Sequence, residues 1–247
     1  MPIYRDDAVI LRTQLLGEAD RIVTLFSREH GIIRAVAKGV RKTASKFGAR
    51  LEPFMVADLM LYEGRSLDVI TQADLIYSYG APIAADYSKF TAANVMAEVV
   101  EKLAEDEAAR PQYHLLIGAL RTLADGSQET QLVLNSYLLR AMSIAGWAPN
   151  FDDCVLTGEP GPHQFFSIIL GGVVSSPMAP GAVRLSIETT THLAALIMGD
   201  WAEAAEASQH VRNQASGVIA GYVQHHLDRK IKSLVHLDRM MEANGRG

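Results

Sequence analysis

Positive side chains gather between residues 28 and 50 and give this sequence its clearest chemical character. Seven cations face one acid there, Glu29; they are Arg28, Arg34, Lys38, Arg41, Lys42, Lys46 and Arg50. Arg34 alternates with apolar neighbours, whereas residues 38–46 are predicted to form a loop in which flexible cations can follow a phosphate backbone. A solvated loop without a partner is the alternative. We predict nucleic-acid contacts by Arg34, Lys38, Arg41, Lys42, Lys46 and Arg50.

The charge of the whole chain hides this stretch. The net charge is −5, but residues 1–50 carry ten Lys or Arg and five Asp or Glu, and the remainder carries thirteen against twenty-three. A basic segment on an acidic protein indicates an anion-binding surface of limited extent.

Catalytic patterns are missing from the sequence. It contains no phosphate-binding Gly-x-x-x-x-Gly-Lys-Ser/Thr loop, no Gly-x-Ser-x-Gly elbow and no His-Glu-x-x-His motif. His225 and His226 are adjacent on a helical pattern, so their side chains point about 100° apart and do not share one metal in the usual way. We expect a protein that is not an enzyme and has no cofactor.

Two further features near the cationic stretch have competing interpretations. The segment from Gly17 to Arg21 places Glu18 and Asp20 close together, and we predict a turn closed by ion pairs rather than a metal or acid–base site. Phe47 could stack on a base, but one aromatic residue at that spacing is more typical of a core.

Short apolar runs up to residue 77 predict five strands. They cover residues 8–11, 22–26, 32–37, 54–62 and 67–77, with Gly31 and Gly64 at two of the junctions. Five short strands within one small domain favour a closed β-barrel, of which the OB-fold is the common oligonucleotide-binding form. We therefore predict an OB-fold domain over residues 1–80.

Helical spacing replaces the strand pattern after Pro82. Ser88 is a candidate cap for a helix that ends before Pro111, and further helices are predicted over 113–123, 129–145 and about 211–227. Gly146 is a candidate helix stop. We predict a helical domain over 81–247 with an irregular insert at 151–185, and hence an α+β multidomain fold.

Several segments together resemble the RecO family of recombination mediators. They read VILRTQLLGEADRIVTLFSREHG (9–31), AKGVRK (37–42), LYEGRSLDVI (61–70), GWAPNFDDC (146–154) and FFSIILGGVV (165–174). The resemblance implies an OB-fold followed by a helical domain, and it makes a partner-binding role the lesser alternative for the turn at residues 17–21. It also implies binding of single- and double-stranded DNA, annealing of complementary strands, and loading of RecA together with RecR on strands coated by single-stranded DNA-binding protein (SSB). An OB-fold module of RNA metabolism stays open as the alternative, since a cationic barrel alone does not distinguish the sugars.

The insert departs from the family pattern. Many relatives carry two Cys-x-x-Cys pairs there, which is the spacing of a structural zinc site. In this chain the four positions are Cys154, Thr157, Ser175 and Met178, and one thiolate does not hold the ion. We predict no bound metal, and apolar support of this cysteine-depleted, zinc-knuckle-like insert by Phe165, Phe166, Ile168 and Ile169.

The resemblance also implies a contact with the acidic, apolar-ended tail of SSB. Arg121 and Arg140 stand beside apolar helical positions and are candidates for the rim of such a groove, although ordinary surface arginines have the same pattern. No apolar run reaches the eighteen residues of a membrane helix, and charged residues interrupt the first twenty positions, where a signal peptide would be apolar. Cys154 is the single cysteine, which fits a reducing compartment. We expect a cytoplasmic, nucleoid-associated protein without a membrane segment.

Overall fold

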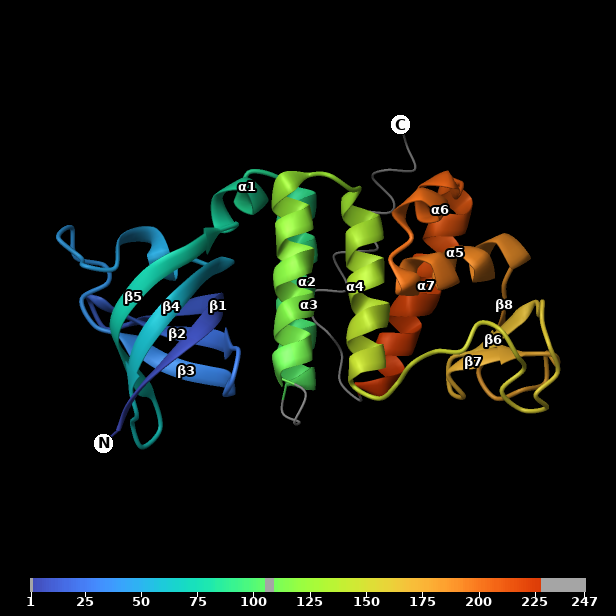
Figure 1. The fold of residues 1–247 in the computed structure, drawn as a ribbon, viewed down its shortest axis with the longest axis horizontal. Coiled ribbons are helices and arrows are strands. Elements are labelled where there is room, and N and C mark those ends of the chain that lie inside the picture. Colours follow the sequence, from blue (N-terminus) through green and yellow to red (C-terminus); the bar gives the residue numbers. More distant parts are fainter. Residues whose placement is uncertain (1, 105–108, 228–247) are drawn as a thin grey trace. The chain divides into compact units, whose positions relative to one another are not determined.

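The computed structural model describes residues 2–104 and 109–227 of the chain. By its internal contacts the chain forms two compact units, Met1–Ser127 and Gln128–Gly247. Within the described residues, the first unit contains a β-barrel and three α-helices, and the second contains four α-helices and a small sheet (Figure 1). The predicted domain limit at residue 80 lies where strands give way to helices, and it stays a prediction.

The five predicted strands are confirmed, and they close into a barrel in the order β1-β2-β3-β5-β4. Neighbouring strands are antiparallel except β3 and β5, and β4 pairs with β1 to close the barrel. This arrangement agrees with the predicted OB-fold. The strands are β1 (Ile3–Leu16), β2 (Asp20–Ser27), β3 (Gly31–Ala37), β4 (Met55–Tyr62) and β5 (Asp68–Ser78).

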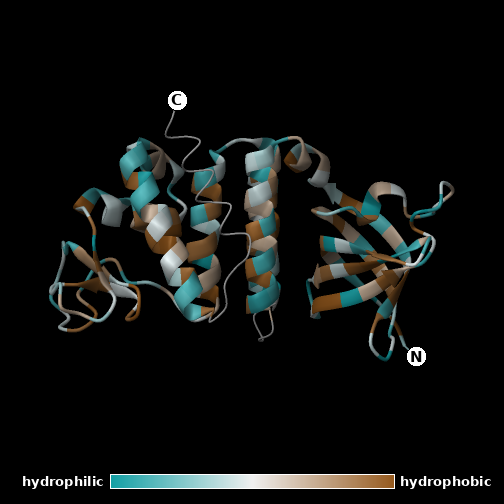
Figure 2. Ribbon diagram, turned by 180° about the vertical axis from the view of Figure 1, so that it is seen from behind, coloured by the Kyte–Doolittle hydropathy of each residue, from teal (hydrophilic) through white to brown (hydrophobic). Residues whose placement is uncertain are grey.

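The barrel is buried on its inside and on part of its outside. Interior side chains include Ile10 and Leu25, whereas Phe26, on the opposite face of β2, is also fully buried. Its ring lies 6.1 Å from that of Tyr113 in α3 (Ala109–Asp125). Figure 2 shows apolar and polar residues mixed along the strands. Both faces of β1 are buried at residues 8–11, which explains why this run is apolar without alternation.

The remaining helices of the first unit are α1 (Gly80–Ala84) and α2 (Tyr87–Leu103). The predicted cap of α2 is wrong: Asp86 is the N-cap, and its carboxylate accepts the N–H groups of Ser88 and Lys89. An aspartate accepts such bonds as well as a serine does, so the predicted cap was two residues too late. Pro111 lies in the first turn of α3, where proline is tolerated, rather than ending α2.

The second unit contains α4 (Thr130–Ile144), α5 (Ile187–Met198), α6 (Trp201–Glu206) and α7 (Gln209–His226). Gly146 ends α4 as predicted, with φ of 90°. Its N–H donates to the Ser143 carbonyl and that of Trp147 to the Met142 carbonyl, which together form a Schellman motif. The helix predicted over about 211–227 is confirmed as α7, and it buries an apolar stripe of Val211, Ala215, Val218, Ile219, Tyr222 and Val223.

The irregular insert carries a three-stranded sheet in the order β7-β6-β8. Its strands are β6 (Phe165–Ser167), β7 (Gly172–Val174) and β8 (Ala182–Arg184). Phe166 is buried and Phe165 packs on Cys154, as predicted. The prediction is wrong for Ile169, which is 47% exposed because it lies in the turn between β6 and β7 rather than on a strand.

Candidate nucleic-acid interface

The cationic loop, defined as residues 38–50, follows β3 and begins against the turn between β1 and β2. The Gly39 N–H donates to the Asp20 carboxylate (2.7 Å), and the Arg41 N–H donates to the Ala19 carbonyl (3.0 Å). The Arg41 guanidinium also donates to the Glu18 carbonyl (2.9 Å). These hydrogen bonds fix the start of the loop to the turn.

These contacts correct the prediction that ion pairs close the turn at residues 17–21. Arg21 instead pairs with Glu52, at 2.7 Å, and the Asp20 carboxylate is used by a backbone N–H. Gly39 has φ of 67°, a conformation that glycine adopts without strain, and its carbonyl accepts the Lys42 N–H. Glycine therefore permits the tight turn that brings the Lys42 N–H to the Gly39 carbonyl.

Phe47 anchors the far end of the loop in the barrel core. Its side chain is 1% exposed, so the core interpretation is confirmed and base stacking by this ring is excluded in this conformation. The Lys46 ammonium lies 5.1 Å from the centre of the Phe47 ring and donates to the Thr71 carbonyl (2.6 Å). The Arg50 guanidinium donates to the Lys46 carbonyl (2.8 Å).

Uncompensated charge is a property that the six predicted contact residues share. All six are exposed, and within residues 2–104 and 109–227 none pairs with a carboxylate; they are Arg34, Lys38, Arg41, Lys42, Lys46 and Arg50. Outside the loop and β3, Arg65 is likewise exposed without such a partner in the described residues. Most other arginines of the first unit do have acidic partners: Arg5 with Asp58, Arg12 with Glu101, Arg21 with Glu52, Arg28 with Asp7, and Arg110 with Glu29. The loop can therefore accept an anion without first breaking an ion pair.

The structure brings the six residues into three places. Arg34 lies on β3, opposite Thr24 of β2. Lys38, Arg41 and Lys42 lie at the start of the loop, and Lys46 and Arg50 lie at its end, where they line a pocket of about 340 Å³. We call it the loop pocket; its other lining residues are Ser45, Phe47, Gly48, Ala49, Met55, Leu75 and Ser78.

Sequence reasoning did not find Asp20 or Leu75 as parts of this region. Asp20 holds the loop through Gly39, and Leu75 of β5 forms a wall of the loop pocket. The partly exposed apolar end of β5, with Leu75 at 46% and Tyr77 at 48% exposure, is a signal only after the strand has been placed beside the loop.

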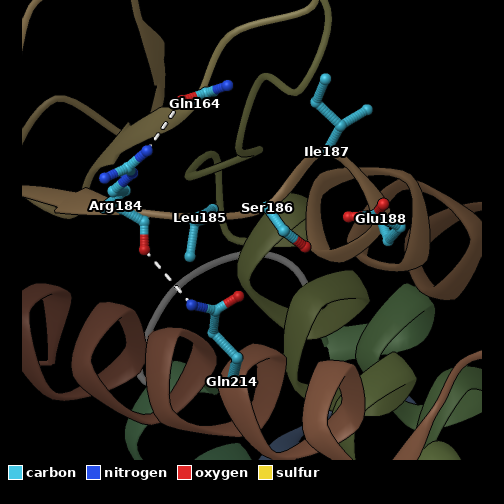
Figure 3. A pocket seen from close by; sticks show the side chains of 7 residues that line it. All are labelled: Gln164, Arg184, Leu185, Ser186, Ile187, Glu188 and Gln214. Carbon is cyan, nitrogen blue, oxygen red and sulfur yellow. Dashed lines mark hydrogen bonds between the residues drawn. The ribbon is translucent and has the colours of Figure 1, made fainter.

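A larger pocket, of about 520 Å³, lies in the second unit between the end of β8, the start of α5 and α7 (Figure 3). Arg184 donates to the Gln164 side chain (3.4 Å), and Gln214 donates to the Arg184 carbonyl (3.3 Å). Hydrogen bonds from its own backbone N–H and then from the Ser186 side chain lower the pKa of Glu188. One cation and one carboxylate among the seven lining residues give no net charge, which does not suit a polyanion.

The four positions of the family's zinc site do not form a ligand set. The Ser175 N–H donates to the Cys154 sulfur (3.4 Å), and Met178 is 88% exposed. Hydrogen bonds from the Thr157 side chain and then from backbone N–H groups lower the pKa of Cys154 to about 6. No group of three or more His, Cys, Asp and Glu able to hold a metal occurs in the described part of the chain. The expectation of no metal stays a prediction.

Other predicted features fall outside the loop. Arg121 on α3 lies near Asp125 (3.6 Å), and Arg140 on α4 is exposed; they belong to different units. The His226 ring stacks on that of Trp147, with the ring centres 5.4 Å apart, so this histidine is partly packed. Among the helices of the described residues, none is both long and apolar enough to span a membrane.

Comparison with known proteins gives consistent matches along the chain. The family model "Recombination protein O N terminal" matches residues 1–79, and "Recombination protein O C terminal" matches residues 84–235. A "DNA repair protein RecO" from Cutibacterium acnes is 50% identical over 246 residues, covering 97% of this chain and 100% of the relative. Relatives of the same name from Thermobifida fusca and Streptomyces griseus are each 46% identical, with the same two coverages.

Proposed function

Since this chain belongs to the RecO family of DNA repair proteins, we propose that its first unit binds single- and double-stranded DNA through the cationic loop. The observation that carries the proposal is the set of six exposed cations without a carboxylate partner in the described residues. These side chains would replace counterions condensed on the phosphates, which gives affinity without sequence preference.

Annealing of complementary strands follows from the same charges. Two strands repel each other through their phosphates, and a surface that neutralises part of this charge lowers the cost of bringing them together. No bond is made or broken, so the proposed activity needs neither ATP nor a catalytic residue. Its place in the cell would be the cytoplasm, on the nucleoid.

Partner proteins complete the proposed role in recombination. A strand coated by SSB presents few free phosphates, so a second contact, to the acidic tail of SSB, would be needed to reach it. Arg121 and Arg140 remain candidates for that contact. With RecR, the protein would then help load RecA on the strand, and its effect on RecA would be indirect.

The experiment is a salt titration of single-stranded DNA binding with the double variant Lys38→Gln/Lys42→Gln. Arg41 is left unchanged because it also fixes the β1–β2 turn. Removal of one phosphate contact should flatten the slope of log affinity against log salt by about 0.7, so the double variant should have a slope flatter by about 1.4. Arg5→Gln is the matched control, since this exposed arginine already pairs with Asp58.

Fluorescence anisotropy with a labelled strand gives both affinity and slope. We expect weaker binding and a flatter slope for the double variant, and values near those of the unchanged protein for Arg5→Gln. An unchanged slope in a folded double variant, or an equal effect of Arg5→Gln, would contradict binding by the cationic loop.

A further inference from the structure

The loop pocket combines a charged rim with an apolar wall. Lys46 and Arg50 stand on the rim, while Leu75 of β5 and Met55 of β4 contribute apolar surface. Leu75 is 46% exposed, although most apolar side chains of the barrel are buried. The volume of the loop pocket, about 340 Å³, is at the lower end of the range of small-ligand pockets, about 300–1,000 Å³.

The two cations are held in place by carbonyl groups rather than by acids. Lys46 donates to the Thr71 carbonyl and Arg50 to the Lys46 carbonyl. Each side chain is therefore oriented by a neutral acceptor, and no carboxylate of the described residues offsets its positive charge. An ammonium has three donors and a guanidinium five, and each of these bonds uses one. Both groups therefore keep donors for phosphate oxygens at the edge of the pocket.

The interior of the loop pocket suits a flat, partly apolar group. At Gly48 no atom lies within 4 Å of the place that a Cβ would occupy, so a ligand can approach the backbone there. Ser45 and Ser78 bring hydroxyl groups that can donate to or accept from the edge of any base. Lining residues of this kind fit a nucleotide whose base enters the pocket while its phosphate groups stay outside.

We propose that the loop pocket binds one nucleotide of single-stranded DNA, with its base against Leu75 and its flanking phosphates on Lys46 and Arg50. This inference rests on the proposed function and adds a contact with the base to contacts with the phosphates. A base held in a duplex is stacked and paired, so it does not reach the pocket. The pocket therefore favours single strands over duplex DNA, whereas the rest of the cationic loop binds both.

The experiment measures the contribution of the bases separately from that of the backbone. The full chain is titrated with oligo(dT) and with a strand of equal length that has tetrahydrofuran in place of every base. The protein should bind oligo(dT) more tightly. Leu75→Thr should weaken oligo(dT) binding about fivefold, since roughly half of a leucine surface remains to be covered. It should leave the affinity for the abasic strand and the salt slope unchanged.

Two further variants make the result specific. Ile76→Thr is the matched control, because this neighbour on β5 is 38% exposed but does not line the loop pocket. It should change neither affinity. Leu75→Phe offers an aromatic face for stacking and should increase the preference for oligo(dT) over the abasic strand, an effect that a purely structural role of Leu75 would not give.

Equal affinity of the unchanged protein for the two strands would overturn the base contact while leaving phosphate binding intact. The same conclusion follows if Leu75→Thr weakens both strands equally, or if Ile76→Thr matches it. Failure of both strands to bind in a salt-dependent manner would overturn the proposed function and the pocket with it.

Discussion

Truncation of Phe47 should loosen the cationic loop from inside the barrel. The Phe47 side chain is 1% exposed and packs in the barrel core between the last lysine of the loop and the short helix at Gly48–Leu51. A buried aromatic side chain covers about 150–250 Å². At about 25 cal/mol per Å², its complete removal from the core costs about 4–6 kcal/mol. Because alanine keeps one methyl group, we expect Phe47→Ala to lower the free energy of unfolding by about 3–5 kcal/mol.

The assay is unfolding in urea, monitored by the hydrogen exchange of amides in residues 2–104. Tryptophan fluorescence does not report on the barrel, since Trp147 and Trp201 both lie in the second unit. Single-stranded DNA affinity is measured in parallel. Phe47→Ala should weaken this affinity, because Lys46 loses its cation–π contact with the ring and keeps only its hydrogen bond to the Thr71 carbonyl.

Phe47→Leu is the control for this prediction. Leucine fills much of the same space, so the free energy of unfolding should fall by less than about 1.5 kcal/mol and DNA affinity should be kept. Weaker DNA binding by both variants with no change in barrel stability would mean that the ring contacts DNA directly, and would refute its role as a core anchor.

Four other outcomes follow from the described residues. Burial and then the charge of Arg212 lower the pKa of His192 from its ordinary 6.5. The contribution of His192 to stability is therefore fully present above pH 6.5 and falls below it, because the unfolded chain takes up the proton first; the free energy of unfolding of His192→Leu should depend less on pH in this range. Elemental analysis should find no stoichiometric zinc, and about one zinc per chain would contradict our interpretation of the Cys154 region. Single-stranded DNA should displace RNA of the same sequence, and the reverse order would favour the RNA-binding alternative. Annealing of bare complementary strands should be accelerated equally with and without ATP, while truncation of the SSB tail should slow only the coated reaction; no acceleration of bare strands would contradict annealing.

The strands and the cationic loop could be predicted because both are local in the sequence. Each strand is a short apolar run ended by turn residues, and the excess of cations over acids is visible in residues 28–50 alone. The absence of acidic partners was not visible there. Glu101 and Glu52 are far in sequence from Arg12 and Arg21, so only the fold shows which arginines are already paired.

Contacts between distant segments account for the rest of what sequence reasoning missed. The unalternating apolar residues 8–11 indicate burial on two faces, but the pattern does not say that α3 packs on the neighbouring strand β2, where Tyr113 meets Phe26. Leu75 enters the loop pocket because β5 returns beside the loop when the barrel closes. Arg41 has the chemistry of a phosphate contact, yet it also holds two carbonyl groups of the β1–β2 turn.

Hydrogen exchange of the full chain, with and without single-stranded DNA, tests most directly whether the cationic loop is the DNA-binding surface. The amides of residues 38–50 lie in the loop that carries five of the six predicted contacts. We predict that DNA slows their exchange and that of β3 around Arg34. Slower exchange confined to residues 128–227, with none in the loop, would contradict the central claim.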